Sequence, residues 1–78
     1  MSASDWLKAE QELNQVVDAA PKNALAHYLR AQVKDRQHDR NGMCDDLKLA
    51  VSLEPSQKFA TNPATLKQLT NQCDLPAA

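Results

Sequence analysis

Apolar residues recur every three or four positions in four stretches of the chain, which is the spacing of one face of an α-helix. The predicted helices cover about residues 5–20, 24–37, 41–54 and 63–73. A single glycine and scattered β-branched residues argue against strands and hairpins. The pattern therefore predicts an all-α protein of antiparallel helical hairpins.

Capping residues and prolines set the expected ends of these helices. The expected start signals are Ser4, Asn23 and the pair Asn62 and Pro63, and the expected stops are Pro21 and Pro55. Residues 37–41 read as a turn. Residues 56–61 read as a connection, whose Phe59 is expected to pack into the core.

The apolar stripes also name the expected core. They comprise Trp6, Ala9, Leu13, Val16, Val17 and Ala20; then Leu25, Tyr28 and Ala31, with Leu29 and Val33 beside them; then Met43, Leu47, Ala50 and Val51, widened by Cys44, Leu49 and Leu53; and finally Leu66, Leu69 and Cys73.

Length and composition exclude several classes of protein. Seventy-eight residues make one small domain, and 42% hydrophobic with 24% charged residues is typical of a folded, soluble chain. A net charge of −1 offers no electrostatic footprint for nucleic acid. No apolar run approaches 18 residues, so membrane insertion is not expected, and the sequence begins without a secretory signal.

One helix pattern occurs twice, 34 residues apart. Pro21 matches Pro55, Leu13 matches Leu47 and Val17 matches Val51 at this offset, as do the pairs Val16 with Ala50 and Ala9 with Met43. A 34-residue unit of two helices closed by proline resembles the tetratricopeptide repeat (TPR) family. The whole chain then reads as one TPR-like domain, a short solenoid of about four helices with one full repeat, residues 24–57, between partial ones.

The match to that family is incomplete at two places. His27, Arg30 and Lys34 stand where the family usually has Trp, Leu and Tyr. The pair Asn62 and Pro63 interrupts the chain where a regular third repeat would already be helical, so residues 63–73 read as an atypical terminal cap.

The resemblance implies a non-enzymatic module that binds a peptide or partner helix in a concave groove. In the family's frame that groove is lined by Leu25, Tyr28, Gln32, Asp35 and Arg36. The other interpretation makes Tyr28 a packing aromatic and Asp35 and Arg36 part of a solvated charged face. The subfamily that clamps a peptide carboxylate has Lys and Asn where Tyr28 and Gln32 stand, so that clamp is not expected.

Catalytic and metal-binding motifs are not found. No triad spacing or Gly-rich phosphate loop occurs, so neither an enzyme nor a cofactor is expected. His27, His38, Cys44 and Cys73 do not form the close pairs of a zinc site. His27 instead reads as a helix-surface residue and His38 as a turn residue.

Self-association is the alternative function. The first helix resembles half of a repeat whose partner helix is missing, which would leave Trp6, Leu13 and Val17 without a covering neighbour. A homodimer through this helix, or docking on a larger protein, would cover them.

The two cysteines are predicted to form a disulfide. Cys44 precedes Pro55 by eleven residues and Cys73 follows Pro63 by ten, so in antiparallel helices both lie about 15 to 17 Å from the shared connection. Two separate buried thiols are the alternative. A bond would favour an oxidising compartment such as a periplasm, whereas free thiols would favour the cytoplasm.

Overall fold

The computed structural model describes residues 3–73 and contains four helices. They are α1 (Ala3–Ala19), α2 (Ala24–Arg36), α3 (Arg40–Leu53) and α4 (Pro63–Gln72). Strands are absent from this part of the chain, so the all-α prediction is confirmed. Within the same residues, none of the helices combines the length and the apolar character needed to cross a membrane.

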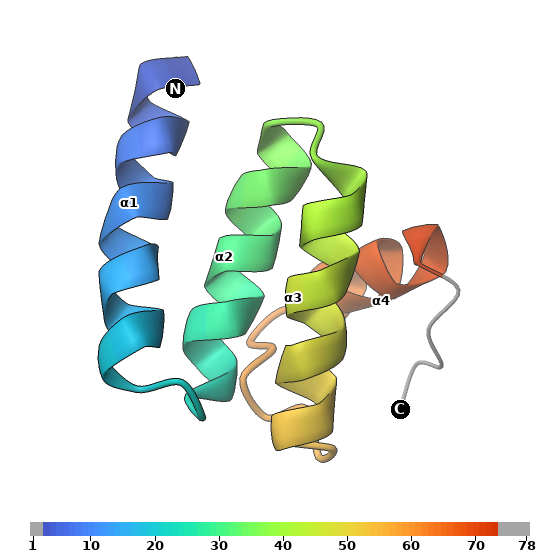
Figure 1. The fold of residues 1–78 in the computed structure, drawn as a ribbon. Helices are drawn as coiled ribbons and strands as arrows, with labels where there is room; N and C mark the ends of the chain where they lie inside the picture. The colour runs from blue at the N-terminus through green and yellow to red at the C-terminus, as the bar shows by residue number, and fades with distance from the viewer. Residues whose placement is uncertain (1–2, 74–78) are drawn as a thin grey trace.

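Three of the helices form two successive antiparallel hairpins. In Figure 1, α1, α2 and α3 stand side by side with α2 in the middle, and α4 runs across behind α3. The packing agrees with this view, because α2 lies against both α1 and α3, and α4 packs on α3. The long axis of α4 thus departs from the direction shared by the other three helices (Figure 1).

Side-chain caps begin three of the helices. Asn23 Oδ1 accepts from the Ala26 amide at 3.2 Å, and Asn62 Oδ1 accepts from the Ala64 amide at 3.1 Å, as the sequence predicted. Asp39, which the sequence placed in the turn of residues 37–41, caps α3 by accepting from the Gly42 amide. Each cap satisfies an amide that the first turn of a helix leaves free.

The predicted cap of α1 is wrong. Helix α1 begins at Ala3, so Ser4 lies in its first turn. Good helix formers follow directly and the chain before residue 5 holds no breaker, so the spacing of apolar residues could not locate this end. The predicted turn at His38 is confirmed, with a φ of 61° that ends α2 in the left-handed region.

The core lies where α2, α3 and α4 meet. The Ala31, Met43, Leu47 and Ala50 side chains are completely buried, and Leu66 and Leu69 of α4 close over them. Two small alanines in this cluster permit a close approach of helices of the kind that the repeat pattern implies. Each of these residues belongs to a stripe that the sequence predicted as core.

The predicted place of Phe59 is also confirmed. Its ring is buried and its centroid lies 4.9 Å from that of Tyr28, at a tilted angle typical of aromatic pairs. The connection between α3 and α4 is held in place there, because the Phe59 amide donates to Glu54 Oε2 at 3.0 Å.

The sequence predicted a wider core than the structure contains. Val16, Leu25, Leu29, Leu49 and Leu53 were expected to face inward, and all five are exposed. When apolar residues cover more than half the circumference of a helix, their spacing does not show which face is buried. Only the face that meets a neighbouring helix becomes part of the core.

The predicted disulfide is present. Cys44 and Cys73 are bonded, with their Cα atoms 5.6 Å apart, so the start of α3 is linked to the end of α4. Arg40 strengthens the same junction, since its Nη2 donates to the Gln72 carbonyl at 2.7 Å and its Nε donates at 3.2 Å. The short terminal helix is therefore fixed at both ends: by its connection to α3 and by this junction.

Candidate functional site

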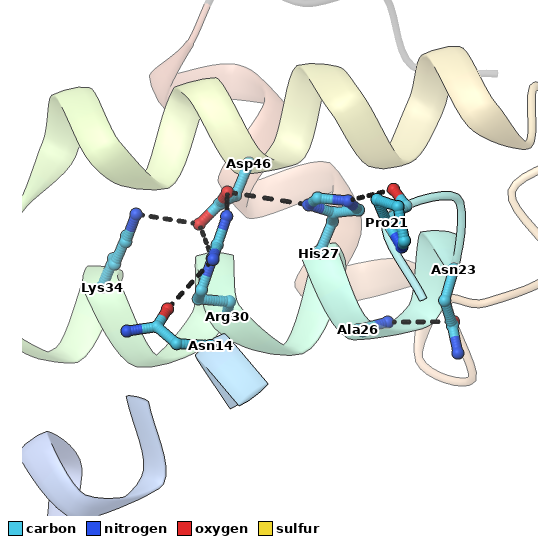
Figure 2. Close-up of polar contacts among 8 residues, drawn as sticks. All are labelled: Asn14, Pro21, Asn23, Ala26, His27, Arg30, Lys34 and Asp46. Atoms are coloured by element: carbon cyan, nitrogen blue, oxygen red, sulfur yellow. Dashed lines mark hydrogen bonds and ion pairs between the residues drawn. The ribbon is translucent and has the colours of Figure 1, made fainter. Parts of the chain in front are cut away.

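A buried carboxylate lies at the α2–α3 interface, and three side chains of α2 converge on it (Figure 2). Asp46 is 2% exposed. Arg30 donates to both of its oxygens, through Nε at 2.9 Å and Nη2 at 2.7 Å, and Lys34 Nζ lies 3.0 Å from Oδ2. Arg30 also donates from Nη1 to Asn14 Oδ1 at 3.0 Å, which ties α1 to the same cluster.

The two cations keep Asp46 charged. Burial raises the pKa of the Asp46 carboxyl, but the hydrogen bonds from Arg30 and Lys34 lower it by more. The pKa of this carboxyl is therefore below its usual value. The same hydrogen bond raises the pKa of the Arg30 guanidinium. A carboxylate whose two oxygens are already bonded has little capacity left for a ligand.

The buried position of His27 corrects the prediction that it is a surface residue. Its side chain is almost fully buried, and its Nε2 lies 2.8 Å from the Pro21 carbonyl oxygen. Because that oxygen can only accept, Nε2 carries the proton and donates it. Nδ1 then faces Asp46 Oδ1 at 3.8 Å, without a hydrogen-bond partner among the residues described.

This cluster is architectural. His27, Arg30 and Lys34 are the three residues that depart from the repeat pattern, and all of them point at one carboxylate of α3. Ion pairs from Arg30 and Lys34 therefore join α2 to α3 at this carboxylate. The sequence contained a signal for this buried cluster. Three basic residues at spacings of three and four form one stripe on α2, and burying such a stripe against another helix calls for an acidic residue opposite it.

The open face of the molecule lies on the other side of α2. Leu25, Leu29, Gln32 and Arg36 follow one another at spacings of four and three and form one line along the helix, here named the α2 stripe. Leu25 is 45% exposed and Leu29 is 40% exposed. Two leucines one turn apart are thus only partly covered by the rest of the described chain.

Helix α1 forms one side of the α2 stripe. The Arg36 guanidinium lies 5.9 Å from the centre of the Trp6 ring, a cation–π contact at the end of the stripe. Trp6, Leu13 and Val16 lie along one side of α1, because they are separated by seven and three residues. Because Trp6 lies beside Arg36 and the two helices are antiparallel, the helix rise puts Val16, ten residues further along α1 and 43% exposed, level with the leucine end of the stripe.

Helix α4 forms the other side. A small pocket of about 140 Å³ separates it from α2, lined by Gln32, Asp35 and Arg36 on one wall and Thr65, Gln68 and Leu69 on the other. Three of the five predicted groove residues are therefore brought together here, next to the terminal helix. Leu25, the fourth, lies at the open end of the α2 stripe.

Tyr28, the fifth predicted groove residue, lies in the core and not on an open surface. It is 3% exposed and packs against Phe59. Burial raises the pKa of its phenol, and a hydrogen bond with Gln32 offsets part of that rise. The packing interpretation of this aromatic is the one that the structure supports. Leu29, which the sequence analysis assigned to the core, takes its place among the accessible residues.

The face predicted for self-association is partly covered within the chain. Val17 is buried where α1 packs on α2, and Trp6 and Leu13 are half-buried. The expectation that all three lack a neighbour is therefore wrong, because α2 is that neighbour. The large apolar side chains of α1 that are exposed are Leu7 and Val16.

Known chemistry and known relatives add no further assignment. Among the described residues, no three His, Cys, Asp or Glu side chains gather as a metal site would require, and Cys44 and Cys73 are bonded to each other. No protein-family model, curated protein or solved structure matches the chain. The resemblance to tetratricopeptide repeats therefore rests on the residues quoted above.

Proposed function

We propose that this chain is a TPR-like, non-enzymatic interaction module that binds an apolar peptide or partner helix along the α2 stripe. The observation that carries the proposal is the exposure of Leu25 and Leu29, one turn apart on a helix bounded on both sides. Apolar anchors at this spacing are how a groove receives a helix or an extended peptide.

The polar end of the stripe supports the same function. Gln32 and Arg36 continue the line of the two leucines towards α4, and Arg36 is held over Trp6. A partner would meet apolar contacts at one end and hydrogen-bond donors at the other, which is the mixed composition typical of protein interfaces. The buried cluster at Asp46 keeps α2 in register with α3 while the stripe is used.

A peptide-display selection tests the proposal. Random 12-residue peptides are selected on the folded protein and then measured against the Leu25→Asp/Leu29→Asp double variant. The Leu7→Asp/Leu49→Asp double variant is the matched control, because both leucines are slightly more exposed than Leu25 and Leu29 and lie outside the stripe. We expect at least a tenfold loss of affinity for the first variant and none for the control. Equal losses, or no selected peptide, would contradict the proposal.

Self-association through α1 is the second candidate. It is favoured by the exposure of Leu7 and Val16 on a helix that packs against α2 alone among the described helices. Light scattering at two concentrations tenfold apart distinguishes the candidates. A constant monomer mass supports the binding module, and a mass that rises with concentration and is restored to the monomer by Val16→Asp supports the dimer.

The disulfide supports a proposal about location. Bonds of this kind persist in oxidising compartments and are rare in the cytosol. Because Cys44 and Cys73 are bonded, we propose an extracytoplasmic compartment such as a periplasm, with the cytoplasm as the alternative if the thiols are free.

A further inference from the structure

A hollow lies at the end of the molecule where α2 begins and α3 ends. Its volume is about 400 Å³, within the range of sites that hold small ligands or a few residues of a peptide. Its lining includes Lys22, Leu25, Leu53, Glu54, Lys58 and Phe59. Leu25 also begins the α2 stripe, so the hollow is continuous with the proposed binding face.

The charges around this hollow are unbalanced. Lys22 and Lys58 are exposed, and neither forms an ion pair with any described residue. The one carboxylate in the lining, Glu54, already accepts a hydrogen bond from the Phe59 amide. Two ammonium groups without an ion-pair partner within residues 3–73, set against one carboxylate, make the hollow electropositive, although the chain as a whole carries a net charge of −1.

The lining of the hollow also contains apolar side chains that are exposed to solvent. These side chains are Leu25 at the start of α2 and Leu53 at the end of α3. Both helices pack in the core, so the two leucines are held in fixed positions. Covering them would remove apolar surface from water, and placing a carboxylate beside the two lysines would pair charges that have no ion-pair partner among the described residues. One ligand can do both only if it carries an apolar side chain next to an acidic one.

We propose that this hollow receives an acidic, apolar segment of the partner protein, with its carboxylates at Lys22 and Lys58 and an apolar side chain between Leu25 and Leu53. The proposal rests on the proposed function and names the chemistry of its partner. These lysines lie outside the two positions, Tyr28 and Gln32, at which the carboxylate-clamping repeats hold their ligand.

The test is a peptide selection carried out on three proteins. Random 12-residue peptides are selected on the unchanged chain, on Lys22→Gln/Lys58→Gln, and on Lys48→Gln/Lys67→Gln. The last variant has the same change in net charge at two exposed lysines that do not line the hollow. All four substitutions are at exposed positions, so folding is expected to persist, and circular dichroism checks it.

The proposal expects enrichment of Asp or Glu next to Leu or Phe on the unchanged chain. The enrichment should persist in the control variant and be lost in Lys22→Gln/Lys58→Gln, with affinity at least fivefold lower. A different outcome would overturn this inference and leave the proposed function intact. In that outcome the selected peptides lack acidic residues and bind Lys22→Gln/Lys58→Gln as tightly as the unchanged chain. Their affinity falls only for the Leu25→Asp/Leu29→Asp variant. Failure to select any peptide would overturn both.

Discussion

Arg30 binds both carboxylate oxygens of Asp46, at 2.9 Å through Nε and at 2.7 Å through Nη2. A planar guanidinium facing a carboxylate in this way fixes the angle as well as the distance between two side chains. Because the residues belong to adjacent antiparallel helices, the pair sets the register of α2 against α3. Lys34 and Asn14 extend the same network to a second cation and to α1.

Asp46→Asn is expected to destabilise the protein by about 2 to 4 kcal/mol. Breaking a buried pair typically costs about 3 to 5 kcal/mol because a charge is left without compensation, and the cost is smaller here because Arg30 and Lys34 can turn towards solvent. Urea unfolding measures the change. Asp45→Asn, an exposed neighbour on α3, is the matched control and should stay within about 0.5 kcal/mol.

The same variant has a pH signature. Since the folded pKa of Asp46 is lowered, its contribution is present above the unfolded value of about 3.9 and is lost as pH falls through the folded pKa. The difference in stability between the unchanged chain and Asp46→Asn should therefore shrink below about pH 4. A difference that stays constant down to pH 2 would show that the network does not depend on the charged carboxylate.

Tyr28 is the only tyrosine of the chain, which makes its ionisation directly visible. Burial raises the pKa of its phenol, so phenolate absorbance should appear in the folded protein above the usual midpoint of about 10. Unfolding in urea should return the midpoint to about 10. Because the folded pKa is raised, stability should decline as pH rises through it. Identical midpoints with and without urea would mean that Tyr28 lies on an open surface.

Ala31 and Ala50 are completely buried in the core, where each lies in a helix crossing. Replacing either with Leu should overpack the interface and cost roughly 1 to 3 kcal/mol. Ala19→Leu is the control, because Ala19 is exposed in the last turn of α1. Thermal melts of the three variants provide the measurement. If Ala31→Leu and Ala50→Leu melt with the control, the close packing described for α2 and α3 is wrong.

Most of the fold could be predicted because local signals decide it. The spacing of apolar residues located all four helices, and Asn23, Asn62 and the prolines marked their ends. The disulfide followed from equal distances along two helices that share a connection. These features depend on residues close in sequence or on simple helix geometry.

The candidate face was harder to predict, because burial depends on which neighbour a helix meets. Leu29 and Tyr28 are adjacent and both apolar enough for a core, yet Tyr28 packs against Phe59 and is 3% exposed, whereas Leu29 is 40% exposed. Phe59 belongs to an irregular connection whose path no periodicity reveals. The role of Asp46 was missed for a related reason: a lone acid on a helix is usually solvated, and only its partners on α2 make it buried.

The disulfide should stabilise the fold by about 3 to 4 kcal/mol, the chain-entropy value for closing a loop of this size. The bonded cysteines are separated by 29 positions. Urea unfolding with and without a dithiol reductant measures the effect, and Cys44→Ser/Cys73→Ser should behave like the reduced protein. Alkylation followed by intact mass is the check: two alkylated cysteines in the untreated folded protein would exclude the bond and remove the basis for the proposed compartment.

The most direct test of the central claim is a methyl NMR titration of the protein with the tightest peptide from the selection. Peptide binding along the α2 stripe predicts shifts at the Leu25, Leu29 and Val16 methyl groups. Leu7 and Leu49, which are as exposed, should keep their positions. Shifts confined to Leu7 and Leu49, or none at Leu25 and Leu29 at saturating peptide, would contradict the claim that this face is the binding site.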